Sequence, residues 1–186
     1  MNFHTASHFS LDDVPESERL HEILDGKRVY KWPSVLAGLI ASELGFRLGI
    51  FVRERKLGWV VIEMLFELQG NWLQRRPDVA FVGHDRWNKP LPADDPPAWS
   101  VIPNLAIEVV CLLNPLQEIA HRIDDYFKAG VELVWVVDPQ ERSVWVHNTP
   151  TRRRVIRESD ELDGGAVLPG FRLSVSELFA AAAKPV

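Results

Sequence analysis

The feature that most constrains the fold is an almost continuous apolar run with one acid inside it, LAIEVVC at residues 105–111. Such a run is typical of a strand that is buried on both faces of a sheet. An ionised carboxylate in a buried strand is costly unless it pairs with a cation or binds a metal, so Glu108 requires an explanation. The alternatives to a metal site are an outward-facing position on an edge strand or a structural pair with an arginine.

Apolar periodicity and turn residues predict the other elements of the chain. Helices are predicted over residues 34–48, after Pro33, and over residues 116–129, ended by Gly130. Strands are predicted at residues 59–68, 78–82, 105–111, 132–138 and 143–148, and residues 168–179 suggest a strand-like stretch before a short terminal helix. The proline-rich residues 88–104 are expected to form a long irregular connection. This order predicts an α/β (α+β) domain with a mixed sheet flanked by helices.

Length and composition limit the domain organisation and the class of protein. The 186 residues suit one domain, which we place at residues 20–180, with an N-terminal extension at 1–19 and a C-terminal tail at 181–186. No basic region followed by an apolar stretch opens the chain, and no uninterrupted apolar run reaches the ~18 residues of a membrane helix. We therefore expect a cytoplasmic protein without a membrane segment.

Charge and cysteine content exclude two further classes of function. The net charge of −5 does not suit a surface that binds nucleic acid over its whole area, so any such binding has to be local. Cys111 is the only cysteine and has no His or Cys partner at ligand spacing, which argues against a zinc site. We expect Cys111 to be a small buried apolar residue.

A second carboxylate begins the strand at residues 78–82. Asp78 follows Pro77 directly, and the strand it opens precedes the one that carries Glu108. Carboxylates on two neighbouring strands are the oxygen ligands that Mg²⁺ and Mn²⁺ prefer. Asp78 and Glu108 are therefore the predicted ligands of a divalent metal.

The order and spacing of several segments resemble one known family. The segments are HEILDG (21–26), RRPDVAFV (75–82), LAIEVV (105–110), YFKAGVELVWVVDP (126–139) and LPGFRLSVSELF (168–179). Together they resemble the Uma2 family, also called DUF820, a bacterial family described as endonucleases with the PD-(D/E)XK nuclease fold. The resemblance covers about residues 20 to 180 and implies a restriction-endonuclease-like domain.

The resemblance also implies roles for individual residues. In that fold an Asp and a Glu hold the metal, here Asp78 and Glu108, and a Lys orients or activates the attacking water. Neither usual lysine position holds Lys, because Val110 stands two residues after the Glu and Arg122 stands one helical turn before Tyr126. With a pKa above ~12, Arg122 cannot act as a base, although it can stabilise negative charge on a phosphate. The alternative for Arg122 is a surface residue that pairs with Glu118.

Other residues are weaker candidates. Glu22, in HEILDG, matches an acid that is common in the family and is a candidate third member of the acidic cluster, whereas Glu43 is the competing acid on the first helix. We expect His121 to be solvated on its helix, and we expect His84 and Asp138 to belong to turns. The chain also departs from the family where Ser-Pro-Ser is replaced by Cys111, Leu112 and Leu113, and where an early helix His is replaced by Val35 and Leu36.

Three functions follow from these observations. The first is a Mg²⁺-dependent (or Mn²⁺-dependent) endonuclease that hydrolyses DNA phosphodiester bonds, with Asp78 and Glu108 as metal ligands and Arg122 as a source of positive charge. The second is a catalytically impaired nuclease fold that binds nucleic acid or acts as an interaction module. The third is an oligomeric scaffold, a homodimer or higher homo-oligomer, suggested by seven tryptophans and by the aromatic strands at residues 59–68 and 143–148.

Overall fold

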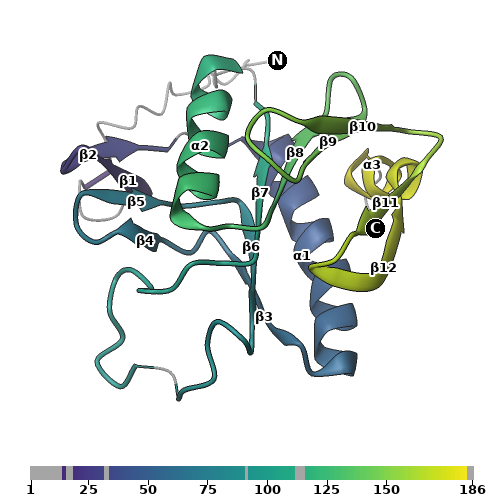
Figure 1. The fold of residues 1–186 in the computed structure, drawn as a ribbon. Coiled ribbons are helices and arrows are strands. Elements are labelled where there is room, and N and C mark those ends of the chain that lie inside the picture. The colour runs from purple at the N-terminus through teal and green to yellow at the C-terminus, as the bar shows by residue number, and fades with distance from the viewer. Residues whose placement is uncertain (1–13, 16–18, 32–33, 91, 112–115, 184–186) are drawn as a thin grey trace, which may run out of the picture.

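A six-stranded mixed sheet divides the molecule into two layers (Figure 1). The computed structural model describes residues 14–15, 19–31, 34–90, 92–111 and 116–183. Its elements are β1 (His21–Leu24), β2 (Lys27–Tyr30), α1 (Val35–Arg55), β3 (Gly58–Ile62), β4 (Phe66–Gln69), β5 (Leu73–Arg75), β6 (Val79–Gly83), β7 (Leu105–Val109), α2 (Leu116–Ala129), β8 (Leu133–Asp138), β9 (Ser143–His147), β10 (Arg153–Arg157), β11 (Glu161–Gly164), β12 (Leu168–Ser174) and α3 (Val175–Ala183).

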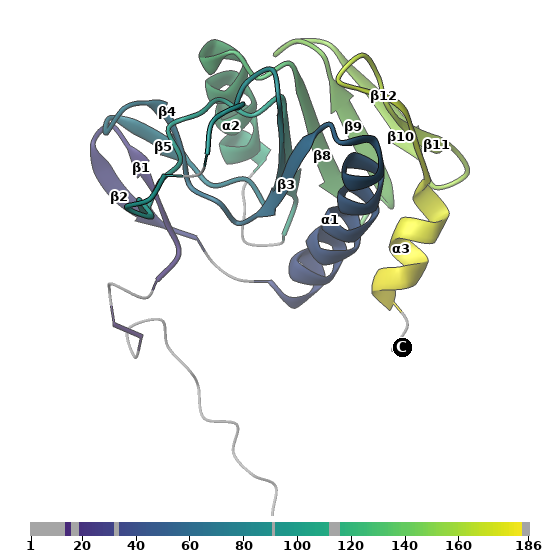
Figure 2. The ribbon, with the colours of Figure 1, turned by 90° about the horizontal axis from the view of Figure 1, so that it is seen from below.

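The strand order of the large sheet is β10-β9-β8-β7-β6-β3. Strands β7 and β8 are parallel and are connected through α2, while every other neighbouring pair in this sheet is antiparallel. Helix α2 covers one face, and α1, α3 and the β11–β12 hairpin cover the other (Figures 1 and 2). The predicted α+β architecture, with a mixed sheet between helices, is confirmed.

The alternation of side chains along β7 decides which layer each residue joins. Leu105, Ile107 and Val109 belong to the core under α1 and α3, and Ala106 belongs to the core under α2. Because successive residues of a strand point to opposite faces, Glu108 faces α2. Strand β7 lies inside the sheet, so the edge-strand alternative for Glu108 is wrong.

A smaller four-stranded sheet, in the order β2-β1-β5-β4, lies beside α2 (Figure 2). It connects to the large sheet through two short segments, one from β4 back to β3 and one from β5 on to β6. Its strands β1, β2 and β5 are short and polar, and the sequence analysis did not predict them. This sheet brings the N-terminal HEILDG segment to the beginning of β6.

The run at residues 59–68, predicted as one strand, is divided between the two sheets. It forms β3 and β4, and Glu63 between them has a left-handed backbone with a φ of 51°. The Glu63 N–H donates to the carbonyl of Asp78 at 3.1 Å, which fixes the turn against the beginning of β6. The prediction of a single strand was wrong because apolar content alone does not reveal a turn made by a non-glycine residue.

Most other predicted elements are confirmed with small changes of boundary. Helix α2 matches its predicted range, and α1 has Ser34 as its N-cap but continues to Arg55, beyond the predicted end at residue 48. The stretch at residues 168–179 forms β12 and the beginning of α3. The N-terminal extension lies mostly outside the described residues, as do Leu112, Leu113 and the end of the predicted tail.

Helix α1 buries one side and exposes a second apolar stripe. Ile40, Leu44 and Leu48 are fully buried against the sheet. Large apolar side chains on the opposite side are exposed, namely Val35, Leu36, Leu39, Phe46 and Ile50. By length and composition alone this helix could cross a membrane, although core helices of the same kind are common. Its buried side gives it the position of a core helix.

Two glycines offer a matched test of the close approach between the backbones of β3 and β6. A Cβ on Gly58 would lie 2.1 Å from the Val82 carbonyl oxygen, because β3 and β6 approach closely there. We expect Gly58→Ala to destabilise the fold by ~1–3 kcal/mol, since backbone atoms cannot move aside cheaply. Gly49, within α1, has open space, and Gly49→Ala should stabilise the fold by up to ~1 kcal/mol through helix propensity. Urea unfolding of both variants checks the pair, and equal effects would contradict the packing of β3 on β6.

Candidate active site

A buried carboxylate, Glu22 of β1, is the centre of an ion-pair network. Glu22 is 1% exposed; its Oε1 accepts from Arg122 Nη1 at 2.7 Å and from the Arg76 N–H at 2.8 Å, and its Oε2 accepts from Arg75 Nη1 at 2.9 Å. Burial raises the pKa of Glu22, but Arg122 and Arg75 outweigh burial and hold that pKa below its usual value. Glu22 is therefore ionised and links β1 to α2.

Glu108 lies next to this network, on the side of β7 that faces α2. Its Oε1 accepts from the Tyr126 hydroxyl at 2.5 Å and from Arg122 Nη1 at 3.2 Å. Burial raises the pKa of the Glu108 carboxyl above its usual value, and Arg122 opposes that shift. The alternative that Glu108 pairs with an arginine is therefore confirmed: Arg122 pairs with both Glu108 and Glu22.

Asp78 stands at the beginning of β6, at the same edge of the sheet as the end of β7. The two strands are antiparallel, with Val79 opposite Ile107, so the first residues before β6 meet the last residues of β7. Asp78 Oδ2 accepts from the Val109 N–H at 2.6 Å, and its Oδ1 accepts from Lys31 Nζ at 2.9 Å. Asp78 and Glu108 therefore lie on neighbouring strands, as the sequence predicts.

Lys31, directly after β2, is a candidate site residue that the sequence analysis missed. Its ammonium donates to Asp78 Oδ1, to Glu63 Oε2 at 3.1 Å and to the Arg76 carbonyl at 2.8 Å, and its side chain is 10% exposed. Burial lowers the pKa of Lys31, but the negative charges of Asp78, Glu108 and Glu63 raise it by more than burial lowers it. The pKa of Lys31 therefore lies above its usual value, and Lys31 is charged. The one sequence signal was a lysine between Tyr30 and Trp32, at neither position where the family has its lysine.

Glu63 is the second carboxylate on the Lys31 ammonium, and the left-handed turn between β3 and β4 positions it. Burial raises the pKa of Glu63 to about 7, with Lys31 opposing the shift and Asp78 adding to it. The Glu63 carbonyl also accepts a short hydrogen bond from Arg76 Nη1. The sequence analysis did not identify Glu63, because it lay inside a stretch predicted as one strand.

The structure brings together all four predicted site residues, Asp78, Glu108, Arg122 and Glu22, where the beginning of β6 meets the end of β7. The surface alternative for Arg122 is wrong, because its side chain is 6% exposed, although its Nε does lie 3.4 Å from Glu118. Arg122 is held because Glu22 and Glu108 flank it on β1 and β7.

The remaining candidates lie outside this cluster. Glu43 pairs with Arg47 on its own helix at 2.7 Å, and His121 is exposed on α2. His84 is exposed in a turn, and Asp138 accepts from the backbone of Gln140 and Glu141, so the turn predictions for these two residues are confirmed. Cys111 is half-buried, so the prediction of a fully buried cysteine was wrong.

A small pocket of about 110 Å³ opens beside the Lys31 ammonium. Lys31, Glu63, Asp78, Val109 and Cys111 line it, together with residues of the first two turns of α1. Cys111 lines this pocket because it follows the end of β7.

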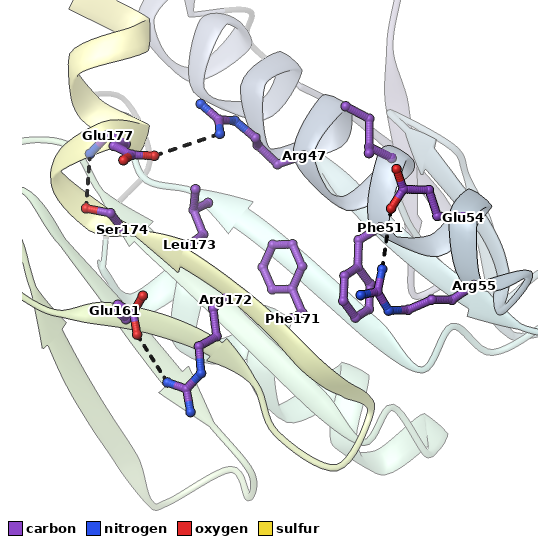
Figure 3. Close-up of a pocket in the computed structure, with 11 residues that line it drawn as sticks. Arg47, Phe51, Glu54, Arg55, Glu161, Phe171, Arg172, Leu173, Ser174 and Glu177 are labelled. Atoms are coloured by element: carbon purple, nitrogen blue, oxygen red, sulfur yellow. Dashed lines mark hydrogen bonds and ion pairs between the residues drawn. The ribbon is translucent and has the colours of Figure 1, made fainter.

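A larger pocket, of about 420 Å³, lies elsewhere, between α1, β12 and α3 (Figure 3). Its charged side chains form pairs with one another, as Arg47 does with Glu177 and Arg172 with Glu161. It contains none of the buried carboxylates described above. Size therefore does not identify the site in this molecule, and the buried ionised groups do.

The oxygens around the Lys31 ammonium are of the type that a hard divalent cation prefers. In the part of the chain that the structure describes, no three His, Cys, Asp or Glu side chains are arranged to hold a metal. The Lys31 ammonium, however, is a stand-in cation among two carboxylates and one carbonyl, the donor types that Mg²⁺ and Mn²⁺ prefer. The residues therefore fit a metal on condition that Lys31 moves away.

The Glu22 network makes a testable contribution to stability. Glu22→Gln should lower the free energy of unfolding by about 3 kcal/mol or more at neutral pH, because Arg75 and Arg122 lose a buried anion. The folded-state pKa of Glu22 is lowered, so this contribution is present above the unfolded carboxyl pKa of ~4.3 and is lost as the pH falls. Urea unfolding at several pH values checks both statements. Glu161→Gln, which breaks an exposed pair with Arg172, should cost below ~1 kcal/mol.

Comparisons with known proteins agree with this fold. The model of the Uma2 family, described as "Putative restriction endonuclease", matches residues 9–176. A solved structure from Anabaena variabilis ATCC 29413, described as a putative nuclease belonging to DUF820, has 20% sequence identity and a TM-score of 0.78, with 94% of this chain and 99% of that chain covered. A search of curated proteins found no match. The low identity makes the second likeness one of fold. The family match spans most of the chain, and the protein is therefore a member of the Uma2 family of nuclease-fold proteins.

Proposed function

We propose that the protein is a Mg²⁺- or Mn²⁺-dependent endonuclease that hydrolyses DNA phosphodiester bonds. The observation that carries the proposal is the meeting of Asp78 and Glu63 around the Lys31 ammonium, with Glu108 on the neighbouring strand β7. Buried carboxylates on adjacent strands are costly to fold, and one of them, Asp78, lines the pocket of about 110 Å³ together with Glu63, which favours a chemical role. Membership of a family described as restriction endonucleases supports the same class of reaction.

Asp78 and Glu108 would hold the metal, with Glu63 as a further oxygen ligand. The metal, when bound, would activate a water molecule and polarise the phosphate. The chain's own groups prepare that position: the Val109 N–H orients Asp78, and Tyr126 and Arg122 orient Glu108. In this proposal Arg122 is a positioning residue, and contact with a phosphate would require it to leave Glu22 or Glu108.

Binding to DNA would be local, because the protein carries a net charge of −5. The exposed arginines of β10 and the turn before it, Arg152, Arg153, Arg154 and Arg157, form the densest basic segment. Arg153 also lies over the Trp145 ring, 4.3 Å from its centroid. This edge of the sheet is our candidate for contact with the phosphate backbone.

A second candidate function is binding without hydrolysis, and one observation favours it. Glu108 Oε1 already accepts from both Tyr126 and Arg122, and Val110 and Arg122 occupy the usual lysine positions. A carboxylate so fully engaged is a poorer metal ligand than a free one. In that case the domain would survive as a nucleic-acid-binding or interaction module.

A homo-oligomer remains part of the proposal, although only one of the two expected strand segments can pair with another copy, because β3 is an edge strand of the large sheet and β9 is not. Strand β9 is hydrogen-bonded on both edges, so residues 143–148 cannot pair across a dimer. Among the described tryptophans only Trp72 is mostly exposed, at 59%, which gives no continuous tryptophan patch. The exposed apolar stripe of α1, with Phe46 at 62%, is the better candidate for a contact between two copies.

Substitution of the two predicted ligands tests the nuclease. We expect Asp78→Asn and Glu108→Gln each to lower plasmid nicking at least about 100-fold and to weaken Mn²⁺ binding in calorimetry, because each removes a charged oxygen ligand. Glu161→Gln, remote from the site, should leave both unchanged. If the wild-type protein binds DNA but does not bind metal and does not nick DNA, the result would favour the second candidate function, binding without hydrolysis.

The oligomer is tested at Phe46. We expect Phe46→Ser to shift the protein toward monomer in light scattering at micromolar concentration, because it removes the most exposed aromatic side chain of the stripe. Trp72→Ser, which lies on the other side of the large sheet from α1, should not change the molar mass measured by light scattering. A wild type that is already monomeric at high concentration would contradict the proposed contact.

A further inference from the structure

We propose that Lys31 is a tethered cation that occupies the metal position of this site and competes with the divalent metal for Asp78 and Glu63. The inference rests on the proposed function and deepens it, because it states what must happen before a metal can bind. It concerns Lys31 itself, which lies outside both sequence positions where the family has its lysine.

The contacts of the Lys31 ammonium are those of a bound cation. Three oxygens surround it, Asp78 Oδ1 at 2.9 Å, Glu63 Oε2 at 3.1 Å and the Arg76 carbonyl at 2.8 Å. An ammonium has three N–H donors, and each of these oxygens accepts one of them. A divalent ion on the same oxygens would lie at about 2.0–2.6 Å from each, too close for the ammonium to remain between them.

Charge balance points the same way. The buried carboxylates Glu22 and Glu108 pair with Arg75 and Arg122, which also contact Glu118 and Asp125, whereas Lys31 is the cation that contacts both Asp78 and Glu63. Removal of Lys31 would leave two carboxylates beside a pocket with no cation between them, an arrangement that a divalent ion neutralises. Lys31 thus supplies the positive charge that a metal would otherwise supply.

The position of Lys31 in the chain lets it leave without disturbing the sheets. It follows the last residue of β2, the edge strand of the small sheet, and its side chain reaches Asp78 at the beginning of β6. The pocket of about 110 Å³ beside Asp78 and Glu63 provides the opening next to the ammonium. Because only molecules with Lys31 withdrawn bind the metal, the apparent affinity falls in proportion to their fraction.

The first test compares metal affinities. Lys31→Met keeps a similar length without charge, and we expect it to bind Mn²⁺ at least about tenfold more tightly than wild type in calorimetry. Lys27→Met, an exposed lysine at the beginning of β2, is the matched control and should bind as the wild type does. Equal or weaker binding by a folded Lys31→Met overturns the inference and makes Lys31 a partner of the metal instead of its competitor.

The second test uses the wild-type chain and does not depend on the folding of a variant. An amine-acetylating reagent, with the modified lysines read by mass spectrometry, should label Lys31 slowly without metal and several-fold faster with saturating Mn²⁺. Lys27 and Lys128, both exposed, should label at the same rate in both conditions. Unchanged labelling of Lys31 at saturating metal overturns the inference.

Failure of the inference and failure of the nuclease give different results. Tighter metal binding by Lys31→Met, without nicking by either protein, supports the competition and contradicts the nuclease. Metal-dependent nicking by wild type, with Lys31 still protected and the variant no tighter, supports the nuclease and overturns the competition.

Discussion

The structure depends on the neutralisation of carboxylates that the fold buries at one edge of its central sheet. Glu22 and Glu108 share Arg122, and Asp78 and Glu63 share Lys31, so no acid of this cluster lacks a cationic partner. These pairs connect β1, β2, β7 and α2, elements that are far apart in the chain. Because a buried charge without a partner costs several kcal/mol, loss of Arg122 would loosen the contact of α2 with β1 and β7.

The same neutralisation shapes the chemistry that the site can perform. A nuclease of this fold needs carboxylates with oxygens available to a metal, whereas a stable apo-protein needs those oxygens paired. The arginine pairs at Glu22 and Glu108 join strands to α2, and they suit a structural role. The Lys31 contacts involve one long side chain at the end of an edge strand, and they suit a reversible one. In our proposal the arginine pairs of Glu22 and Glu108 are therefore permanent, whereas the Lys31 contacts can be exchanged for a metal.

Membership of the Uma2 family and the shared fold establish the framework, but the local pattern of this chain is its own. The family's two lysine positions hold Val110 and Arg122, and the positive charge at Asp78 comes from Lys31 instead. In this chain the positive group at Asp78 comes from the residue directly after β2, while Asp78 and Glu108 lie at β6 and β7. Function is decided by this local chemistry, since one fold can serve several activities.

The sequence by itself determined the central strands, both long helices, and the placement of Asp78 and Glu108 on neighbouring strands, because apolar periodicity reports burial directly. It could not reveal β1, β2 and β5, whose short polar runs become strands only by pairing with each other. Nor could it reveal Lys31 and Glu63, which lie 47 and 15 residues before Asp78 and meet it only after both sheets form. The tertiary structure alone decided which cation faces which acid, because an ion pair depends on distance in space and leaves no periodic trace in the chain.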